Sequence, residues 1–308
     1  MLQNFNPAQD AQMIKASLMK PKKMDQLIEI ITHRSNAQRQ EILQAYNNQN
    51  EINLQSEFQS NLSSNFRDAV LALFYPPVDY DCYQIKKAVD RLGTNEDTLI
   101  EIIASRSIER LNEIKQRYFQ LYNKDVKEVI KSDTSGHLQK ILLSLLETDR
   151  SMNKNPNPDE CNESAKRLFF STKEKKEVTY NSFIYVFTKK SREELAFIAK
   201  IYYSVYKETL LEAVERIFSG DGGRVLKAII YSLLCPSEYF AYRINKALKG
   251  FLVTDSILMR VLISRDEIDI DLIKRYYKQL YGITLYEAVS NKTSGDYRNL
   301  LLSLIGNY

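Results

Sequence analysis

Two stretches of the chain decide its fold: RLGTNEDTLIEIIASRS at residues 91–107 and KSDTSGHLQKILLSLL at residues 131–146. The first contains a basic residue, Arg106, and a serine, Ser135, follows it 29 residues later at the start of an apolar run. The same pair recurs at the same interval at Arg34 and Ser63, at Lys190 and Ser219, and at Arg265 and Ser294. The basic residues are 72, 84 and 75 residues apart. One sequence unit is therefore repeated four times.

Length and composition indicate a globular, non-secreted protein. The 308 residues are 44% hydrophobic, enough to bury a sizeable core, whereas each quarter alone would be marginal, so the repeats are expected to pack on one another. The formal net charge of +4 gives no signal of polyanion binding. Cys82, Cys161 and Cys235 lack CxxC spacing, which favours a reducing compartment and a role in core packing. With no signal segment and no membrane-spanning run in the sequence, we expect a cytoplasmic protein whose membrane contact is peripheral.

Helical periodicity predicts an all-α fold. In residues 99–122 apolar side chains return every three or four positions, which indicates an amphipathic helix pair interrupted near Ser107. The β-prone stretch YNSFIYVF at residues 180–187 occupies the place of a helix in the other copies, so the repeat predicts helix there. The polar, proline-bearing segment 149–162 is expected to be a linker that divides the chain into two halves of two repeats.

These residues resemble the annexin repeat. The glycine turn in residues 91–107 and the Thr-Ser-Gly sequence at residues 134–136 carry the resemblance, which covers residues 8–306. Further similar stretches are HRSNAQRQEI at 33–42 and SLIG at 303–306. The resemblance implies five-helix repeats in a curved disc, whose loops hold calcium ions that bridge to acidic phospholipid. The implied repeats span residues 8–76, 77–148, 163–236 and 237–308. Helical composition and repeat spacing alone would equally allow a HEAT-like or armadillo-like scaffold.

The resemblance implies calcium ligands in the second repeat. Calcium takes about six to eight oxygens, and a glycine turn offers main-chain carbonyls while a distant carboxylate completes the shell. The carbonyls would come from Val89, Arg91 and Gly93, and the carboxylate from Asp133. Arg91 replaces the family's first glycine, but only its carbonyl is needed. The alternative is that Gly93 ends a helix with positive φ and Asp133 caps the next helix.

The other three copies lack one or both halves of this site. In place of Gly93 they have Pro21, Glu177 and Leu252, and in place of Asp133 they have Asn61, Ile217 and Lys292. The fourth copy keeps a glycine, Gly250, in the turn, but a lysine cannot ligate a cation. One residual calcium site is therefore expected.

Lysines gather where the calcium ligands are missing. They are Lys20, Lys22 and Lys23 in the first copy, Lys173, Lys175 and Lys176 in the third, and Lys292 in the fourth. The ammonium of Lys292 would take roughly the place of the missing ion. Each basic residue near an anionic leaflet contributes about 1 kcal/mol within a Debye length of about 8 Å. The hypothesis is that these lysines bind acidic membranes partly without calcium; the alternative is an ordinary solvated rim.

Charged residues at inward positions form a second group. By the same resemblance, Asp81 with Arg106 and Glu101 with Arg265 match residues that line the channel between the two halves of an annexin. We expect these pairs to fix the packing of the repeats, because buried charges must be partnered. Arg34 and Arg265 are further expected to hold helix ends and loop carbonyls.

The residues do not assemble an enzyme motif. His33 and His137 lie in different copies, which argues against a metal triad, and the Gly220–Gly223 run lacks a P-loop ending. The tyrosines fall at helical spacing typical of a core, so nucleic-acid binding is not expected. The sequence therefore predicts a non-enzymatic protein that binds acidic phospholipid with weak or partial calcium dependence. The alternative is a calcium-independent scaffold for cytoskeletal or other proteins, and the short segment before the first repeat favours membrane binding.

Overall fold

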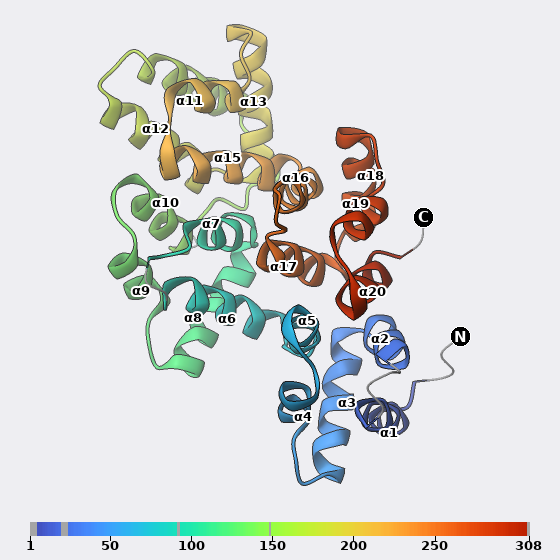
Figure 1. Ribbon diagram of the computed structural model, residues 1–308. Helices are drawn as coiled ribbons and strands as arrows, with labels where there is room; N and C mark the ends of the chain where they lie inside the picture. The colour runs from blue at the N-terminus through green and yellow to red at the C-terminus, as the bar shows by residue number, and fades with distance from the viewer. Residues whose placement is uncertain (1–4, 20–23, 91–92, 148, 307–308) are drawn as a thin grey trace. The chain divides into compact units, whose positions relative to one another are not determined.

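The computed structural model describes residues 5–19, 24–90, 93–147 and 149–306, and all regular structure among them is helical (Figure 1). The first repeat supplies α1 (Pro7–Leu18), α2 (Met24–His33), α3 (Asn36–Gln49), α4 (Leu54–Asn61) and α5 (Ser64–Leu73). The second supplies α6 (Pro77–Val89), α7 (Glu96–Ser105), α8 (Ile108–Tyr122), α9 (Val126–Asp133) and α10 (Gly136–Leu146).

The later repeats follow the same order of helices. The third supplies α11 (Pro158–Ser171), α12 (Lys176–Lys189), α13 (Arg192–Tyr206), α14 (Leu210–Ile217) and α15 (Gly220–Leu234). The fourth supplies α16 (Pro236–Lys249), α17 (Asp255–Arg265), α18 (Ile270–Tyr281), α19 (Leu285–Lys292) and α20 (Gly295–Ile305). The prediction of an all-α fold is confirmed, residues 180–187 lie inside α12, and Ser107 separates α7 from α8.

Serine caps explain where the third helix of most repeats begins. The hydroxyls of Ser35, Ser107 and Ser191 accept hydrogen bonds from main-chain N–H groups at the starts of α3, α8 and α13. Such bonds satisfy donors that the first helical turn leaves free. In the fourth repeat Asp266 stands at this position and makes no such cap, and α18 begins only after Asp269. The conserved break between helices is therefore built differently in that repeat.

The serines at the constant interval serve a different purpose. Ser63, Ser135, Ser219 and Ser294 each precede the last helix of a repeat, but their side chains make no capping hydrogen bond. The next residue is left-handed in every repeat, with φ of 48° at Ser64, 59° at Gly136 and 63° at Gly220 and Gly295. Glycine adopts this conformation without steric cost. The constant element is thus a sharp main-chain turn.

The helices gather into two compact units that cut across the order of the sequence. One unit consists of Met1–Tyr80 and Phe240–Tyr308, and the other of Asp81–Tyr239. The first repeat thus shares a unit with the fourth, and the second with the third. The expectation that segment 149–162 divides the chain into two halves is therefore wrong, and α11 already begins at Pro158. The domain boundaries within each unit remain a prediction.

Matching contacts join the repeats within each unit. In the first unit α2 packs against α20, and the hydroxyls of Thr32 and Ser303 lie 2.7 Å apart. In the second unit α10 packs against α12 and α15, and the hydroxyls of Ser144 and Thr188 lie 2.8 Å apart. The apolar faces of these helices are buried, which explains why repeats distant in sequence associate.

Each unit has its own apolar core. Ile14, Leu27 and Ile30 are fully buried in the first unit, and Phe183 and Phe187 in the second. None of the three cysteines forms a disulfide; Cys82 and Cys161 are buried and Cys235 is half-buried. Within the described residues, no helix is both long and apolar enough to traverse a bilayer.

Candidate functional site

The turn between α6 and α7 brings both halves of the candidate calcium site together. The N–H of Asn95 donates to the main-chain oxygen of Ala88 at 2.9 Å and closes the turn, and Gly93 adopts a φ of +84° within it. Thr94 Oγ1 donates to the main-chain oxygen of Asp133 at 2.8 Å. This bond joins the turn to the end of α9, so the aspartate lies next to the glycine turn although 40 residues separate Gly93 from Asp133 in sequence.

The described oxygens in this arrangement are of the types that bind calcium. Among the described residues, none donates a hydrogen bond to the main-chain oxygens of Val89 or Gly93. The Asp133 carboxylate is half-exposed and accepts one bond, from Ser132 Oγ at 2.6 Å. Arg91, the third expected carbonyl donor, lies outside the described residues. Main-chain and carboxylate oxygens are the ligands that calcium prefers.

The position of Asp133 and the absence of a side-chain metal cluster in the described residues restrict how calcium could be held here. Asp133 is the last residue of α9, and Ser135 occupies the capping position of α10, so the alternative that Asp133 caps the next helix is wrong. Across the described parts of the chain, no cluster of three or more His, Cys, Asp or Glu side chains could hold a metal. Any calcium site there would depend on main-chain oxygens.

The fourth repeat keeps a similar turn but presents an ammonium to it. The N–H of Thr254 donates to the main-chain oxygen of Ala247 at 3.0 Å, which repeats the closure seen in the second repeat. Lys292, the last residue of α19, donates from Nζ to the main-chain oxygen of Gly250 at 3.3 Å. The charged side chain therefore occupies a carbonyl oxygen of the turn that a calcium ion would need as a ligand.

Large apolar side chains lie exposed on the same turn. Phe251 is 100% exposed and Leu252 is 78% exposed. An isolated exposed apolar residue is common on protein surfaces. Two adjacent ones beside a lysine are the combination that the headgroup region of a bilayer favours.

The third repeat cannot form the glycine turn because α12 begins early. Its first residue is Lys176, so Glu177, which stands in place of Gly93, lies inside the first helical turn. The Glu177 carboxylate accepts a bond from Lys140 Nζ at 2.6 Å and lies 2.9 Å from His137 Nε2. These two neighbours lower the pKa of Glu177. Ile217, in place of Asp133, ends α14 and offers no side-chain ligand.

The lysines of this repeat lie on an exposed segment. Lys173, Lys175 and Lys176 are all exposed. Lys173 Nζ lies over the rings of Phe169 and Phe170, at 5.0 and 5.5 Å from their centroids, and Phe170 is itself 56% exposed. Basic and apolar groups therefore occur together here, as they do around Lys292.

The first repeat has an amide, Asn61, where the second repeat has the Asp133 carboxylate. Pro21 and the three lysines Lys20, Lys22 and Lys23 lie outside the described residues. Asn61, in place of Asp133, donates from its amide to the main-chain oxygen and the carboxylate of Glu57, both at 2.9 Å. Its polar group is thus turned to its own helix.

The inward charges divide into one observed pair and one untested pair. Arg106 Nη2 donates to Asp81 at 2.7 Å, and both side chains are buried. Burial opposes the charge of Arg106, but the Asp81 carboxylate outweighs it and raises the pKa of Arg106. Glu101 is fully buried, and Arg265 pairs with Asp269 at 2.7 Å. Glu101 and Arg265 belong to different units, so their pairing stays a prediction.

The expectation that Arg34 and Arg265 hold helix ends and loop carbonyls is met only in part. Arg265 binds Asp269, the residue at the start of α18, but among the described residues neither arginine bonds a loop carbonyl. Arg34 Nε donates to the buried carboxylate of Asp10 at 2.7 Å, and the Arg265 guanidinium lies 4.5 Å from the centroid of the Phe240 ring. A residue that the sequence did not single out, Arg39, takes this role in the first repeat. It is 2% exposed and donates to three main-chain carbonyls at 2.6 to 2.9 Å. Nothing in the local pattern distinguishes it from a surface arginine.

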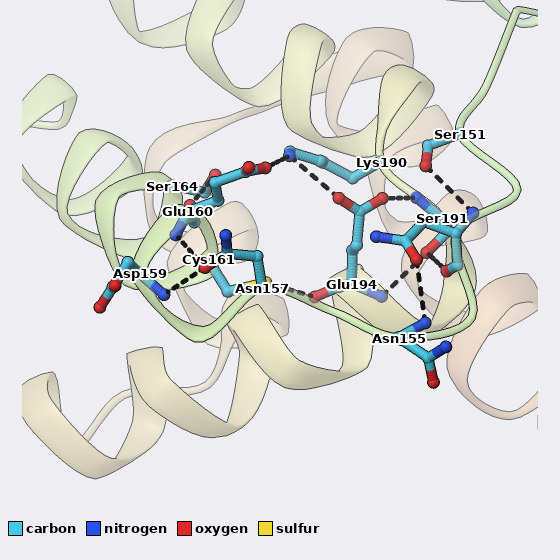
Figure 2. Close-up of polar contacts among 11 residues, drawn as sticks. Ser151, Asn155, Asn157, Asp159, Glu160, Cys161, Ser164, Lys190, Ser191 and Glu194 are labelled. Atoms are coloured by element: carbon cyan, nitrogen blue, oxygen red, sulfur yellow. Dashed lines mark hydrogen bonds and ion pairs between the residues drawn. The ribbon is translucent and has the colours of Figure 1, made fainter.

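The third repeat replaces the landmark arginine by Lys190. Figure 2 shows Lys190 between Glu160 of α11 and Glu194 of α13, at 3.6 and 3.0 Å. Glu194 also accepts the N–H of Ser191 at 2.8 Å, which completes the cap of α13. In all four repeats the basic landmark therefore binds a carboxylate that anchors helices within the unit.

Comparison with known proteins identifies the family. An annexin family model matches residues 9–73, 80–145 and 239–304, which lie in the first, second and fourth repeats. Annexin A1 isoform p37 of Columba livia is 34% identical over 305 residues, 98% of this chain and 89% of that protein. The solved structure of a K16A mutant of annexin A8 matches with a TM-score of 0.94 and 31% identity, over 100% of this chain and 97% of that one.

A calcium-bound structure is also similar. Annexin (Sm)1, solved in its calcium-bound form, matches with a TM-score of 0.87 and 27% identity, over 100% of this chain and 92% of that one. The family model matches three repeats, and the sequence identity to annexin A1 extends over 98% of the chain. This chain therefore belongs to the annexin family.

Proposed function

We propose that this annexin binds acidic phospholipid membranes peripherally, from the cytoplasm, with partial calcium dependence. Calcium-dependent phospholipid binding is general to the family. In this chain the second repeat would hold calcium, through the carbonyls of Val89, Arg91 and Gly93 and the carboxylate of Asp133. When bound, the ion would supply positive charge shared between these oxygens and lipid phosphate. We propose no enzymatic activity and no nucleic-acid binding.

The observation that carries the calcium-independent part is the contact between Lys292 Nζ and the main-chain oxygen of Gly250. The ammonium gives this turn a permanent positive charge, which a chelator does not remove. On the same turn Phe251 is fully exposed to water and Leu252 is 78% exposed. Burying one such side chain contributes about 1.5–3 kcal/mol. Attraction of the charge to anionic headgroups and burial of these side chains would therefore act together.

The lysines of the third repeat support the same mechanism. Lys175 and Lys176 stand at the start of α12, where the helix macrodipole disfavours positive charge. An anionic surface would compensate for this unfavourable placement. The exposed ring of Phe170, beside Lys173, adds an apolar contact. This repeat would therefore contribute adhesion that needs no metal.

Co-sedimentation with phosphatidylserine vesicles, in chelator and across a calcium titration, tests the proposal. We expect a calcium-independent component that weakens as salt rises, plus a component that calcium adds. The double variant Lys173→Gln and Lys175→Gln should lower the first component by about 2 kcal/mol, or roughly 30-fold. The control Lys200→Gln with Lys278→Gln removes two exposed helical lysines and should change it little.

Each part of the proposal can fail separately. Chelator-resistant binding that salt does not weaken would contradict the lysine mechanism. Binding that requires calcium throughout would leave the second repeat as the working site and remove the role of Lys292. No binding under any condition would favour the protein-interaction scaffold.

A further inference from the structure

One side of α18 carries a run of exposed apolar side chains that the proposed membrane contact does not use (Figure 1). Ile268, Leu272, Leu280 and Ile283 are between 44% and 66% exposed. Leu272 and Leu280 lie within α18, Ile268 and Ile283 lie just outside its ends, and half-buried Tyr276 stands between the two leucines. Steps of three or four residues place side chains on one side of a helix. These five residues therefore form an apolar strip, called here the α18 strip.

The buried side of α18 fixes how this helix corresponds to those of the other repeats. Within its unit α18 packs against α19 and α20, and Tyr277 is 2% exposed. The third helix of each other repeat has a buried tyrosine at the same distance from its basic landmark: Tyr46, Tyr118 and Tyr202. Position-by-position comparison of α3, α8, α13 and α18 is therefore possible.

The other repeats do not carry the strip. At the positions of Ile268, Leu272 and Leu280 they have Ala37, Glu41 and Gln49 in the first, Glu109, Glu113 and Leu121 in the second, and Glu193, Phe197 and Val205 in the third. Because α3 and α8 form the same part of the repeat with polar residues there, folding does not require the strip. Single exposed apolar residues are ordinary, whereas contiguous ones mark interaction sites.

Two positive charges stand on the other exposed flank of α18. Arg275 and Lys278 are exposed, and among the described residues neither side chain forms a hydrogen bond or an ion pair. The neighbouring Lys274 is already engaged, by Asp271 at 3.3 Å and by the main-chain oxygen of Ile305 at 2.9 Å. The charge available to a partner on this helix is therefore positive.

A groove runs along this basic flank. Its volume is about 430 Å³, and Arg275, Lys278 and Tyr286 form part of its lining. Asp271, which Lys274 holds, also lines it. The nearby Glu287 carboxylate caps α19 and accepts the N–H and the hydroxyl of Thr284 at 2.9 and 2.8 Å. Acidic side chains that enter the groove would therefore meet unpaired cations.

We propose that α18 docks an amphipathic helix of a partner protein, one with an apolar face bordered by acidic residues. The apolar face covers Leu272 and Leu280, and the acidic residues pair with Arg275 and Lys278. Helices of this kind bind through apolar residues spaced three or four positions apart. The site does not depend on the membrane-binding turns, so it can exist whether or not the proposed function is correct.

Charge and shape select this occupant over two others. A second copy of the chain that paired through the same face would bring the cations of both copies together, which is unfavourable. A bilayer surface is flat and would leave the groove unfilled. An acidic helix meets both the charge and the concave shape.

Isothermal titration of the full chain, in chelator and without lipid, tests the site with two synthetic peptides. Each has about 18 residues, about 27 Å as a helix, with leucine at every third or fourth position. One carries glutamate at the positions that border the leucines, and the other carries lysine there. We expect saturable binding of the glutamate peptide, weakened by salt, and no binding of the lysine peptide.

Two double variants separate the apolar and charged parts of the site. Leu272→Gln with Leu280→Gln should weaken binding of the glutamate peptide at least tenfold, because both leucines lose their apolar contact. Arg275→Gln with Lys278→Gln should weaken it about fivefold, as expected for partly screened charges. The matched control is Leu121→Gln, at the position of α8 that corresponds to Leu280, and it should bind as the wild type does.

Several results would overturn the proposal. They are saturable binding of neither peptide, equal binding of both, or unchanged binding by the two double variants. Vesicle binding should be the same in Leu272→Gln with Leu280→Gln as in the wild type. Its loss would assign the strip to the membrane contact instead of to a protein partner.

Discussion

The turns that precede α7 and α17 are closed by equivalent main-chain hydrogen bonds, but the charged side chains beside them have opposite signs. Asn95 donates to Ala88 at 2.9 Å in the second repeat, and Thr254 donates to Ala247 at 3.0 Å in the fourth. The same hydrogen bond therefore closes both turns, although they do not share the candidate calcium ligands. Packing of the flanking helices fixes the path of the chain, and the function of the turn depends on a few side chains around it.

The differences between these turns fall at two positions. Asp133 brings a carboxylate to the second repeat, whereas Lys292 brings an ammonium to the fourth. Gly93 adopts a φ of +84°, while Leu252 does not take a left-handed conformation, which is unfavourable for a bulky residue. If the proposed calcium site is correct, it needs both the negative charge and the left-handed backbone, and the fourth repeat has neither.

Asp133→Ala should produce the largest effect, because it removes the carboxylate of the only repeat that retains both halves of the site. We expect the calcium-added part of vesicle binding to fall about 100-fold, the upper end of the range for groups that merely support metal ligands. Binding in chelator should not change. Glu128→Ala, which removes an exposed carboxylate from the same helix, is the matched control. A full calcium response in Asp133→Ala would place the calcium site elsewhere.

Lys292→Asp converts the charge of the fourth turn to that of the second. Binding in chelator should fall by about 2 kcal/mol, roughly 30-fold, because the change removes one positive charge and adds a negative one. Lys292→Met should lose only about half of that free energy. We expect a gain of calcium response only when Leu252→Gly is added, since the glycine permits the left-handed turn. A calcium response in Lys292→Asp alone would mean that backbone freedom is not needed.

Phe251→Ser separates the apolar contribution of the fourth turn from its charge. Vesicle affinity in chelator should fall about tenfold, consistent with burial of one aromatic side chain. The chain contains no tryptophan, so Phe251→Trp supplies a single tryptophan, which can be excited beyond the absorption of the 20 tyrosines. Its emission should shift to shorter wavelength when phosphatidylserine vesicles are added in chelator. Phe119→Trp, at a 56% exposed position on α8, is the control that should not shift.

Asp266→Asn tests a second difference between these repeats. Asp266 stands between α17 and α18, at the position where Ser107 caps α8 in the second repeat. Burial raises the pKa of Asp266 from 3.8 to about 6, although Arg39 opposes the shift. When folding raises the pKa of a carboxyl group, the group contributes stability at pH values below its pKa in the unfolded chain. This contribution is lost as the pH rises through the folded pKa of about 6.

The variant should therefore match the wild type near pH 4 and exceed it by up to about 3 kcal/mol above pH 7, since the pKa is raised by about two units and one unit corresponds to about 1.4 kcal/mol. Thermal unfolding at several pH values measures the difference, and vesicle binding should not change. Asp271→Asn, at a side chain that is 73% exposed, is the matched control. Equal stability of Asp266→Asn and the wild type at every pH would contradict the raised pKa.

Much of the fold was predictable from local patterns. The apolar period located α7 and α8, and Ser107 marked the break between them. The repeat outweighed the β propensity of residues 180–187, which lie in α12. The resemblance to the annexin repeat also implied that the Gly93 turn and Asp133 belong together, and the hydrogen bond from Thr94 to Asp133 joins them.

The partners of charged side chains were less predictable. Arg34 binds Asp10 instead of loop carbonyls, and Glu177 binds Lys140 from the preceding repeat. Arg150 lacks a carboxylate that sequence proximity to Asp149 would have suggested. A long side chain reaches several candidate partners, and only the packed positions of the helices decide among them.

The sequence by itself determined the four repeats, their helices and the loss of calcium ligands in three of them, because periodicity, capping and ligand chemistry are local properties of the chain. Only the tertiary structure decided that the first repeat shares a unit with the fourth and the second with the third. The hydroxyl pairs Thr32–Ser303 and Ser144–Thr188 join these repeats across long separations in sequence. Burial of complementary apolar faces selects such partners, and no local pattern encodes which two faces will meet.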